Sequence, residues 1–250
     1  MSNLKIIAGN WKMNGSVADG KELMKGIRSG ATAQDFQAVK VIVCPPAILV
    51  PAVREDAGEF IAVGGQNCHH ETAGAHTGHI SAEMLKDAGC KYVIVGHSER
   101  RQNDGQTNAD VAKSAQAAKR AGLEPIICIG ETEDIRNKGT HIKDVITQLS
   151  ESLPADFKAN DFMVAYEPVW AIGTGKTAEN SDIVEMHAAL RQMLESGFGS
   201  DGADIAILYG GSVKPGNAKD ILSIDNVGGV LVGGASLKAD DFVNIIKAGA

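Results

Sequence analysis

The chain contains 250 residues, of which 44% are hydrophobic and 22% charged, a balance that excludes a wholly disordered protein. Lys and Arg number 24 against 31 Asp and Glu, and the formal net charge of −7 argues against a protein that coats nucleic acid or binds anionic membranes generally. Glycine is over-represented, at 29 residues, and without a collagen-like period this excess indicates tight turns or backbone that lies close to a ligand.

Eight short apolar runs predict eight β-strands. Most are continuously apolar rather than alternating, which is typical of strands buried on both faces. Their short length and flanking glycines favour strand over helix. In chain order they are Leu4–Ala8, Val39–Cys44, Phe60–Gly64, Tyr92–Gly96, Pro125–Gly130, Phe162–Tyr166, Ile205–Tyr209 and Val227–Val232.

Segments with helical spacing lie between these runs. We expect helices at Ser81–Ala88, Asp110–Ala121 and Asp182–Leu194, and a closing helix that contains Phe242, Ile245 and Ile246. Alternating strands and helices predict an α/β protein with a parallel sheet and helices outside it. Eight such units in a chain of this length predict a (β/α)8 TIM barrel that forms a single domain over residues 1–250.

An open, doubly wound sheet is the competing fold. It normally carries a glycine-rich nucleotide turn of the form G-x-G-x-x-G after its first strand. Here that turn is Gly9-Asn10-Trp11-Lys12, which lacks the pattern. The barrel is therefore preferred, and its active site is expected at the carboxyl ends of the strands.

Polar side chains follow three of the predicted strands at their carboxyl ends. Asn10 and Lys12 follow the first strand, His97 and Glu99 the fourth, and Glu167 the sixth. Each residue type taken singly more often has a structural role. Together, around one barrel mouth, they supply a base, an electrophile and a fixed cation. The set predicts abstraction of a proton next to a carbonyl group.

Two glycine-rich turns follow the seventh and eighth strands. They contain Gly210, Gly211 and Ser212, and Gly233 and Gly234, respectively. Loops after these two strands form the recurrent phosphate site of barrels, where backbone N–H groups converge on phosphate oxygens. Simple turn glycines are the alternative, but their occurrence at both expected positions favours phosphate binding.

The segment Pro168–Ala178 follows the candidate base. Its middle is apolar and its end is rich in small residues, including Gly173, which predicts a lid that excludes water. The run Gly173–Thr177 also resembles part of a P-loop. A complete P-loop requires glycine where Trp170 stands, so nucleotide hydrolysis is disfavoured.

A dense polar cluster, His69, His70, Glu71, His76 and His79, follows the third strand. Histidine and glutamate can ligate metals, but this spacing matches no zinc signature. We expect a protruding polar loop and no metal site.

The remaining signals concern the compartment. Cys44, Cys68, Cys90 and Cys128 are widely spaced and form no C-x-x-C motif, which is typical of reduced cysteines. The first residues do not resemble a signal peptide, and no apolar run reaches about 18 residues. A cytoplasmic protein is expected.

Over essentially its whole length, the sequence resembles triosephosphate isomerase. The matching segments are Gly9–Asn14, Gly96–Arg101, Cys128–Glu131, Ala165–Lys176, Tyr209–Val213 and Gly229–Leu237. Such an ordered set of motifs is highly specific.

The resemblance implies interconversion of dihydroxyacetone phosphate and D-glyceraldehyde 3-phosphate without a metal or an organic cofactor. By the family's established mechanism, Glu167 is the base and neutral His97 is the electrophile towards the enediol(ate) oxygens. Lys12 and Asn10 hold substrate and stabilise negative charge, and Glu99 supports Lys12. The remaining residues implied by the resemblance would hold the phosphate: Gly173, Ser212, Gly233 and Gly234.

The resemblance also implies a homodimer in which the loop of residues 66–81 inserts into the partner. Thr77 matches the family's threonine, but His76 replaces an aromatic residue and His79 replaces a glutamate. In the family, that glutamate pairs across the interface with the arginine that matches Arg100. Asp104 and Gln106 also depart from the usual residues. We expect the strength of this dimer to depend on pH.

Two other functions stay open. One is a phosphate-binding barrel lyase or synthase, and the other is a non-catalytic barrel that serves protein interaction. The combination of Asn10, Lys12, His97 and Glu167 with a lid disfavours both. The expected partners are small triose phosphates, with no nucleic acid or membrane.

Overall fold

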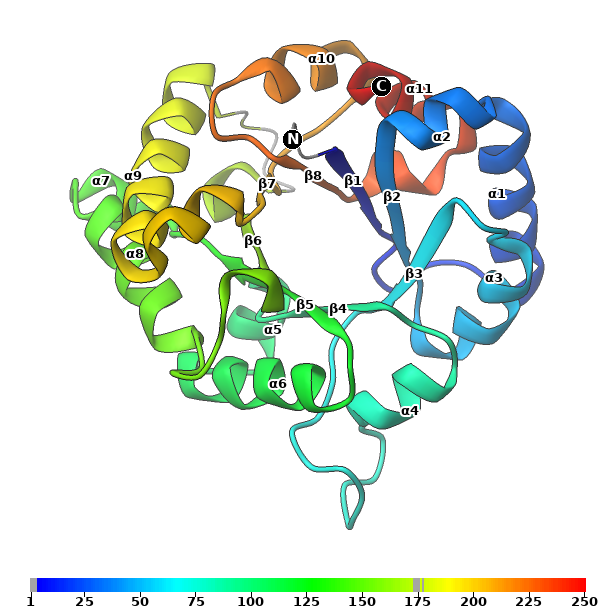
Figure 1. The fold of residues 1–250 in the computed structure, drawn as a ribbon, viewed down its shortest axis with the longest axis horizontal. Coiled ribbons are helices and arrows are strands. Elements are labelled where there is room, and N and C mark those ends of the chain that lie inside the picture. Colours follow the sequence, from blue (N-terminus) through cyan, green and yellow to red (C-terminus); the bar gives the residue numbers. More distant parts are fainter. Residues whose placement is uncertain (1–3, 173–175, 177) are drawn as a thin grey trace.

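The computed structural model describes residues 4–172, 176 and 178–250. Eight parallel strands close into a barrel in chain order, with β1 paired to both β2 and β8 (Figure 1). The strands are β1 (Lys5–Asn10), β2 (Val39–Cys44), β3 (Ile61–Gly65), β4 (Tyr92–Val95), β5 (Glu124–Ile129), β6 (Met163–Tyr166), β7 (Ile207–Tyr209) and β8 (Gly229–Val232). The predicted (β/α)8 fold is confirmed.

Helices surround the barrel on all sides (Figure 1). The α-helices are α1 (Val17–Gly30), α2 (Ala33–Ala38), α3 (Val50–Asp56), α4 (Ala82–Asp87), α5 (Ser98–Asn103), α6 (Asn108–Arg120), α7 (Glu133–Asn137), α8 (His141–Ser152), α9 (Asn180–Phe198), α10 (Pro215–Ser223) and α11 (Ala239–Gly249). Five 3-10 turns complete the described part of the chain: η1 (Ala47–Leu49), η2 (Ala159–Asp161), η3 (Val169–Ala171), η4 (Gly199–Asp204) and η5 (Gly234–Leu237).

Alternate side chains of each strand pack into two separate apolar layers, as strands buried on both faces require. A small cluster fills the barrel interior and includes Ile42, Ile94 and Ile126. A larger cluster packs between the strands and the outer helices and includes Val43 and Phe242. Polar side chains at the carboxyl end of the barrel therefore lie next to a rigid apolar interior that excludes water.

All four predicted helices are present, and their ends follow local capping. The longest, α9, begins before the predicted Asp182, because Glu179 and Asp182 form a reciprocal capping box. It ends before Gly199, which has a positive φ of 62°. Two further long helices, α1 and α8, are present that the sequence analysis did not predict.

The segment between β3 and α4 projects away from the barrel (Figure 1). Residues 71–80 are all exposed, as expected for a protruding loop. Within it the rings of His69 and His76 are 4.0 Å apart. Across the described residues, no group of three or more His, Cys, Asp or Glu side chains is arranged to hold a metal ion.

All four cysteines are buried and unpaired. No helix in the described part of the chain is long and apolar enough to cross a membrane.

Candidate active site

A cavity of about 420 Å³ opens at the carboxyl end of the barrel. The loops after β1, β4, β6, β7 and β8 all contribute to its wall, as expected for this fold. Its lining includes Asn10, Lys12, His97, Glu99, Glu167, Ser212, Gly233 and Gly234. Eight of the nine residues predicted from the sequence therefore meet in one cavity. The ninth, Gly173, lies outside the described residues.

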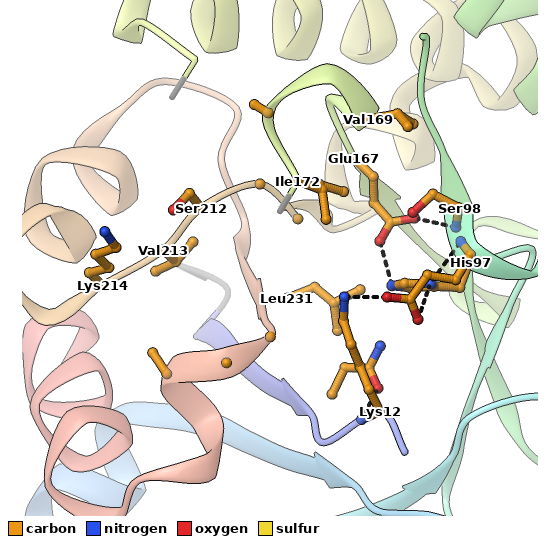
Figure 2. Close-up of a pocket in the computed structure, with 18 of the residues that line it drawn as sticks. Lys12, His97, Ser98, Glu167, Val169, Ile172, Ser212, Val213, Lys214 and Leu231 are labelled. Carbon is orange, nitrogen blue, oxygen red and sulfur yellow. Dashed lines mark hydrogen bonds and ion pairs between the residues drawn. The ribbon is translucent and has the colours of Figure 1, made fainter. Parts of the chain in front are cut away.

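Glu167 follows β6 directly and is only 2% exposed. One carboxylate oxygen lies 2.9 Å from Nε2 of His97, and the other accepts the backbone N–H of Ser98 at 2.9 Å (Figure 2). Burial alone would raise the pKa of Glu167, but His97 and the Ser98 N–H outweigh burial and lower the pKa. The carboxylate is therefore ionised at neutral pH, as a base must be.

Two glycines make room for Glu167. A Cβ atom at Gly130 would lie 1.7 Å from the backbone oxygen of Glu167, and one at Gly210 would lie 2.9 Å from its Cγ. Neither distance can be accommodated without movement of Glu167. The glycines at these strand ends are thus required by close approach to the candidate base.

His97 is the N-cap residue of α5. Its Nδ1 accepts the backbone N–H of Glu99 at 3.3 Å, so the ring hydrogen is assigned to Nε2, which faces Glu167. This is the pattern of a neutral imidazole. Burial lowers the pKa of His97, but the adjacent Glu167 carboxylate raises it by more. If that carboxylate moves away, the positive end of the helix favours the neutral ring.

Lys12 is held in an uncommon backbone conformation, with φ of 51°. Its N–H donates to Oδ1 of Asn10 at 3.0 Å, and its carbonyl accepts from Nε2 of Gln66 at 2.7 Å. Its ammonium group lies 2.6 Å from Oε1 of Glu99 (Figure 2). Asn10, Gln66 and Glu99 together fix this cation at the cavity, where it can stabilise an oxyanion.

The opposite side of the cavity is formed by the turns after β7 and β8. Ser212 and Lys214 stand there, across Leu231 from the His97–Glu167 pair (Figure 2). Gly233 and Gly234, from the turn after β8, also line the cavity. Val169, Ala171 and Ile172, from the predicted lid, line the wall beside Glu167.

Three contributors were missed by sequence reasoning. Ser98 acts through its backbone N–H, which leaves no mark in the sequence. Gln66 reaches Lys12 from a loop 54 residues away. Glu131, only 1% exposed, accepts hydrogen bonds from the Tyr166 hydroxyl at 3.1 Å and the Trp170 indole at 2.8 Å. A glutamate directly after a strand end was the one available signal for Glu131.

A family model described as triosephosphate isomerase matches residues 5–249. The chain is 52% identical over 244 residues to a triosephosphate isomerase of Ruegeria sp. (strain TM1040), covering 98% of this chain and 97% of that protein. It is also 52% identical over 247 residues to one of Caulobacter vibrioides, covering 97% and 96%. The crystal structure of a triosephosphate isomerase from Bartonella henselae matches with a TM-score of 0.90 at 43% identity, over 98% of both chains. The chain belongs to the triosephosphate isomerase family.

Proposed function

We propose that this site interconverts dihydroxyacetone phosphate and D-glyceraldehyde 3-phosphate, with Glu167 as the general base. The observation that carries the proposal is the buried Glu167 carboxylate, 2.9 Å from the His97 ring nitrogen in a cavity that Lys12 also lines. Family membership supplies the reaction, and the geometry supports the role of each residue.

The reaction begins when the Glu167 carboxylate turns from His97 and Ser98 towards the bound substrate. It removes a proton from the carbon beside the carbonyl, which gives an enediol(ate), and returns a proton to the neighbouring carbon. His97 donates from Nε2 to the oxygen on which negative charge develops and takes up the proton of the neighbouring hydroxyl, so that the hydroxyl proton moves from one oxygen to the other, and Lys12 supplies a fixed positive charge. Asn10 holds the substrate and the Lys12 backbone, and Glu99 orients the Lys12 ammonium group.

The phosphate group binds on the opposite side of the cavity, at Ser212, Gly233 and Gly234, with Gly173 of the lid. Backbone N–H groups of small residues can approach phosphate oxygens closely. The lid residues Val169 and Ile172 limit access of water, so that the enediol(ate) is protonated rather than losing its phosphate.

We further propose that residues 1–250 act as one domain in a cytoplasmic homodimer. The loop of residues 66–81 is the expected contact. It projects from the barrel, and its residues 71–80 are all exposed.

A coupled assay on purified protein tests the proposal. Either triose phosphate should be converted to the other, and Glu167→Gln should mainly depress kcat because the amide cannot accept the proton. Absence of isomerase activity in folded wild-type protein would refute the proposed function. An unchanged kcat in Glu167→Gln would refute the role of Glu167 as the base.

A further inference from the structure

Trp170 lies between two groups of opposite charge. Its indole N–H donates to Oε1 of Glu131 at 2.8 Å. The guanidinium carbon of Arg136, in α7, lies 5.0 Å from the centre of the Trp170 ring. The two charged groups also pair with each other, with Nη1 of Arg136 3.3 Å from Oε1 of Glu131. The Trp170 indole thus contacts the Glu131 carboxylate at its edge and the Arg136 guanidinium group at its face.

Glu131 is buried, and its charge requires a nearby cation. Within the described residues, Arg136 is the cation at ion-pair distance from Glu131, and Oε2 of Glu131 has no hydrogen-bond partner there. A buried carboxylate without a cation tends to take up a proton or turn towards water. Either change would weaken the acceptor that holds the Trp170 indole.

The position of Trp170 determines part of the cavity wall. Trp170 is the middle residue of η3, between Val169 and Ala171, which both line the cavity. The backbone N–H of Val169 also donates to the carbonyl of Glu131 at 3.1 Å. Glu131 therefore holds this wall at two points: its backbone carbonyl binds Val169, and its side chain binds Trp170. These two residues lie two and three positions after Glu167.

Arg136 also reaches the far end of the same segment. Its Nη2 pairs with Asp182, in the first turn of α9, and Asp182 caps that helix by accepting the backbone N–H of Glu179 at 3.0 Å. One guanidinium group thus links the residues at which the predicted lid begins to the helix that follows it.

We propose that Arg136 is a positioning residue, which holds Glu131 against Trp170 and so fixes the cavity wall at residues 169–172. Arg136 is not among the residues that line the cavity. Its effect on turnover rests on the proposed isomerase function, whereas its effect on Trp170 does not.

The test compares Arg136→Gln and Arg136→Lys with wild type. The chain has two tryptophans, Trp11 and Trp170, so the indole N–H region of an ¹⁵N–¹H spectrum is simple, and Trp170→Phe assigns its resonance. We expect Arg136→Gln to shift the Trp170 resonance and leave that of Trp11 in place. It should also reduce kcat/KM by about tenfold to a hundredfold through misplacement of the wall. Arg136→Lys keeps the positive charge. It should therefore have a Trp170 resonance closer to the wild-type position and a smaller loss of kcat/KM than Arg136→Gln.

A double-mutant cycle separates positioning from general destabilisation. If Arg136 acts through the charge of Glu131, Arg136→Gln should have little further effect in a Glu131→Gln background. Full additivity would overturn the proposal. Arg28→Gln is the matched control, because this exposed arginine of α1 donates to the backbone oxygen of Asp56 and does not line the cavity. It should leave both readouts unchanged.

The other outcomes are equally decisive. An unmoved Trp170 resonance in folded Arg136→Gln would overturn the proposal, as would a moved resonance with an unchanged kcat/KM in an active enzyme. If Arg136→Gln does not fold, Arg136→Lys and the Glu131→Gln background provide the same two readouts. If wild-type protein were inactive, the proposed function would fail, and the resonance alone would decide whether Arg136 fixes Trp170.

Discussion

His187 couples the stability of the barrel to pH. It lies in α9 with 0% exposure, and its ring is 6.0 Å from that of Tyr166 and 6.5 Å from that of Tyr209. Nδ1 lies 3.3 Å from the carbonyl of Asn226, and Nε2 has no partner among the described residues. Burial lowers the pKa of His187 to about 4. The folded protein therefore holds this imidazole neutral at any pH above that value.

The sign and size of the effect follow from linkage. In the unfolded chain this histidine takes up a proton near pH 6.5, whereas in the folded protein it does so only near pH 4. Unfolding is therefore favoured progressively as the pH falls through this window. The displacement corresponds to a loss of about 3 kcal/mol in the free energy of unfolding, at a slope of about 1.4 kcal/mol per pH unit. Above the window the contribution of His187 is fully present.

Equilibrium urea unfolding of wild type and His187→Gln between about pH 7.5 and pH 4 measures this loss. The glutamine amide can still donate to the Asn226 carbonyl but cannot titrate. The variant should be less stable at pH 7.5, because its packing is imperfect, and the difference from wild type should shrink by about 3 kcal/mol at pH 4. Both proteins are measured at one concentration, because the stability of an oligomer depends on it. Parallel pH profiles would refute the reasoning.

Three further changes probe the site and the proposed dimer. Lys12→Met should reduce kcat/KM on the order of a hundredfold, because the oxyanion loses its fixed cation; steady-state kinetics would show this, and an unaltered value would argue against the role of Lys12. Gly130→Ala should destabilise the fold by about 1–3 kcal/mol and lower kcat, because its Cβ would meet Glu167; a fully stable, fully active variant would contradict this. Dimer dissociation should vary between about pH 8 and about pH 5, because the loop proposed as the contact is rich in histidine, the residue type whose charge generally changes over this range. Sedimentation that is constant over this range would count against that expectation.

The barrel could be predicted because its strands are short, continuously apolar and regularly spaced. Their ends could not, because a strand continues as far as its backbone pairs. Asn10 is polar, yet it belongs to β1 because it pairs with Cys44 of β2. Ile205 is apolar, yet it precedes β7 because η4 extends to Asp204. Hydrophobicity alone therefore predicts neither that Asn10 belongs to β1 nor that Ile205 lies outside β7.

The candidate site was predictable where side chains carry the chemistry, as at Lys12, His97 and Glu167. It was not predictable where a contact is made by backbone or depends on tertiary structure. Nearly every residue carries a backbone N–H, so nothing in the sequence marks that of Ser98 as the donor to Glu167. The conformation of Lys12 depends on a hydrogen bond from Gln66, which only the closed barrel brings near. The ion pair between Arg136 and Glu131 likewise requires α7 to fold back over the strand end.

Turnover in deuterium oxide tests the central claim most directly. If Glu167 moves a proton through an enediol(ate), wild-type protein should convert dihydroxyacetone phosphate to D-glyceraldehyde 3-phosphate that carries solvent deuterium at the carbon receiving the proton. Glu167→Gln should form this product at least about a hundredfold more slowly. A Glu167→Gln variant that forms the product at the wild-type rate would contradict the account.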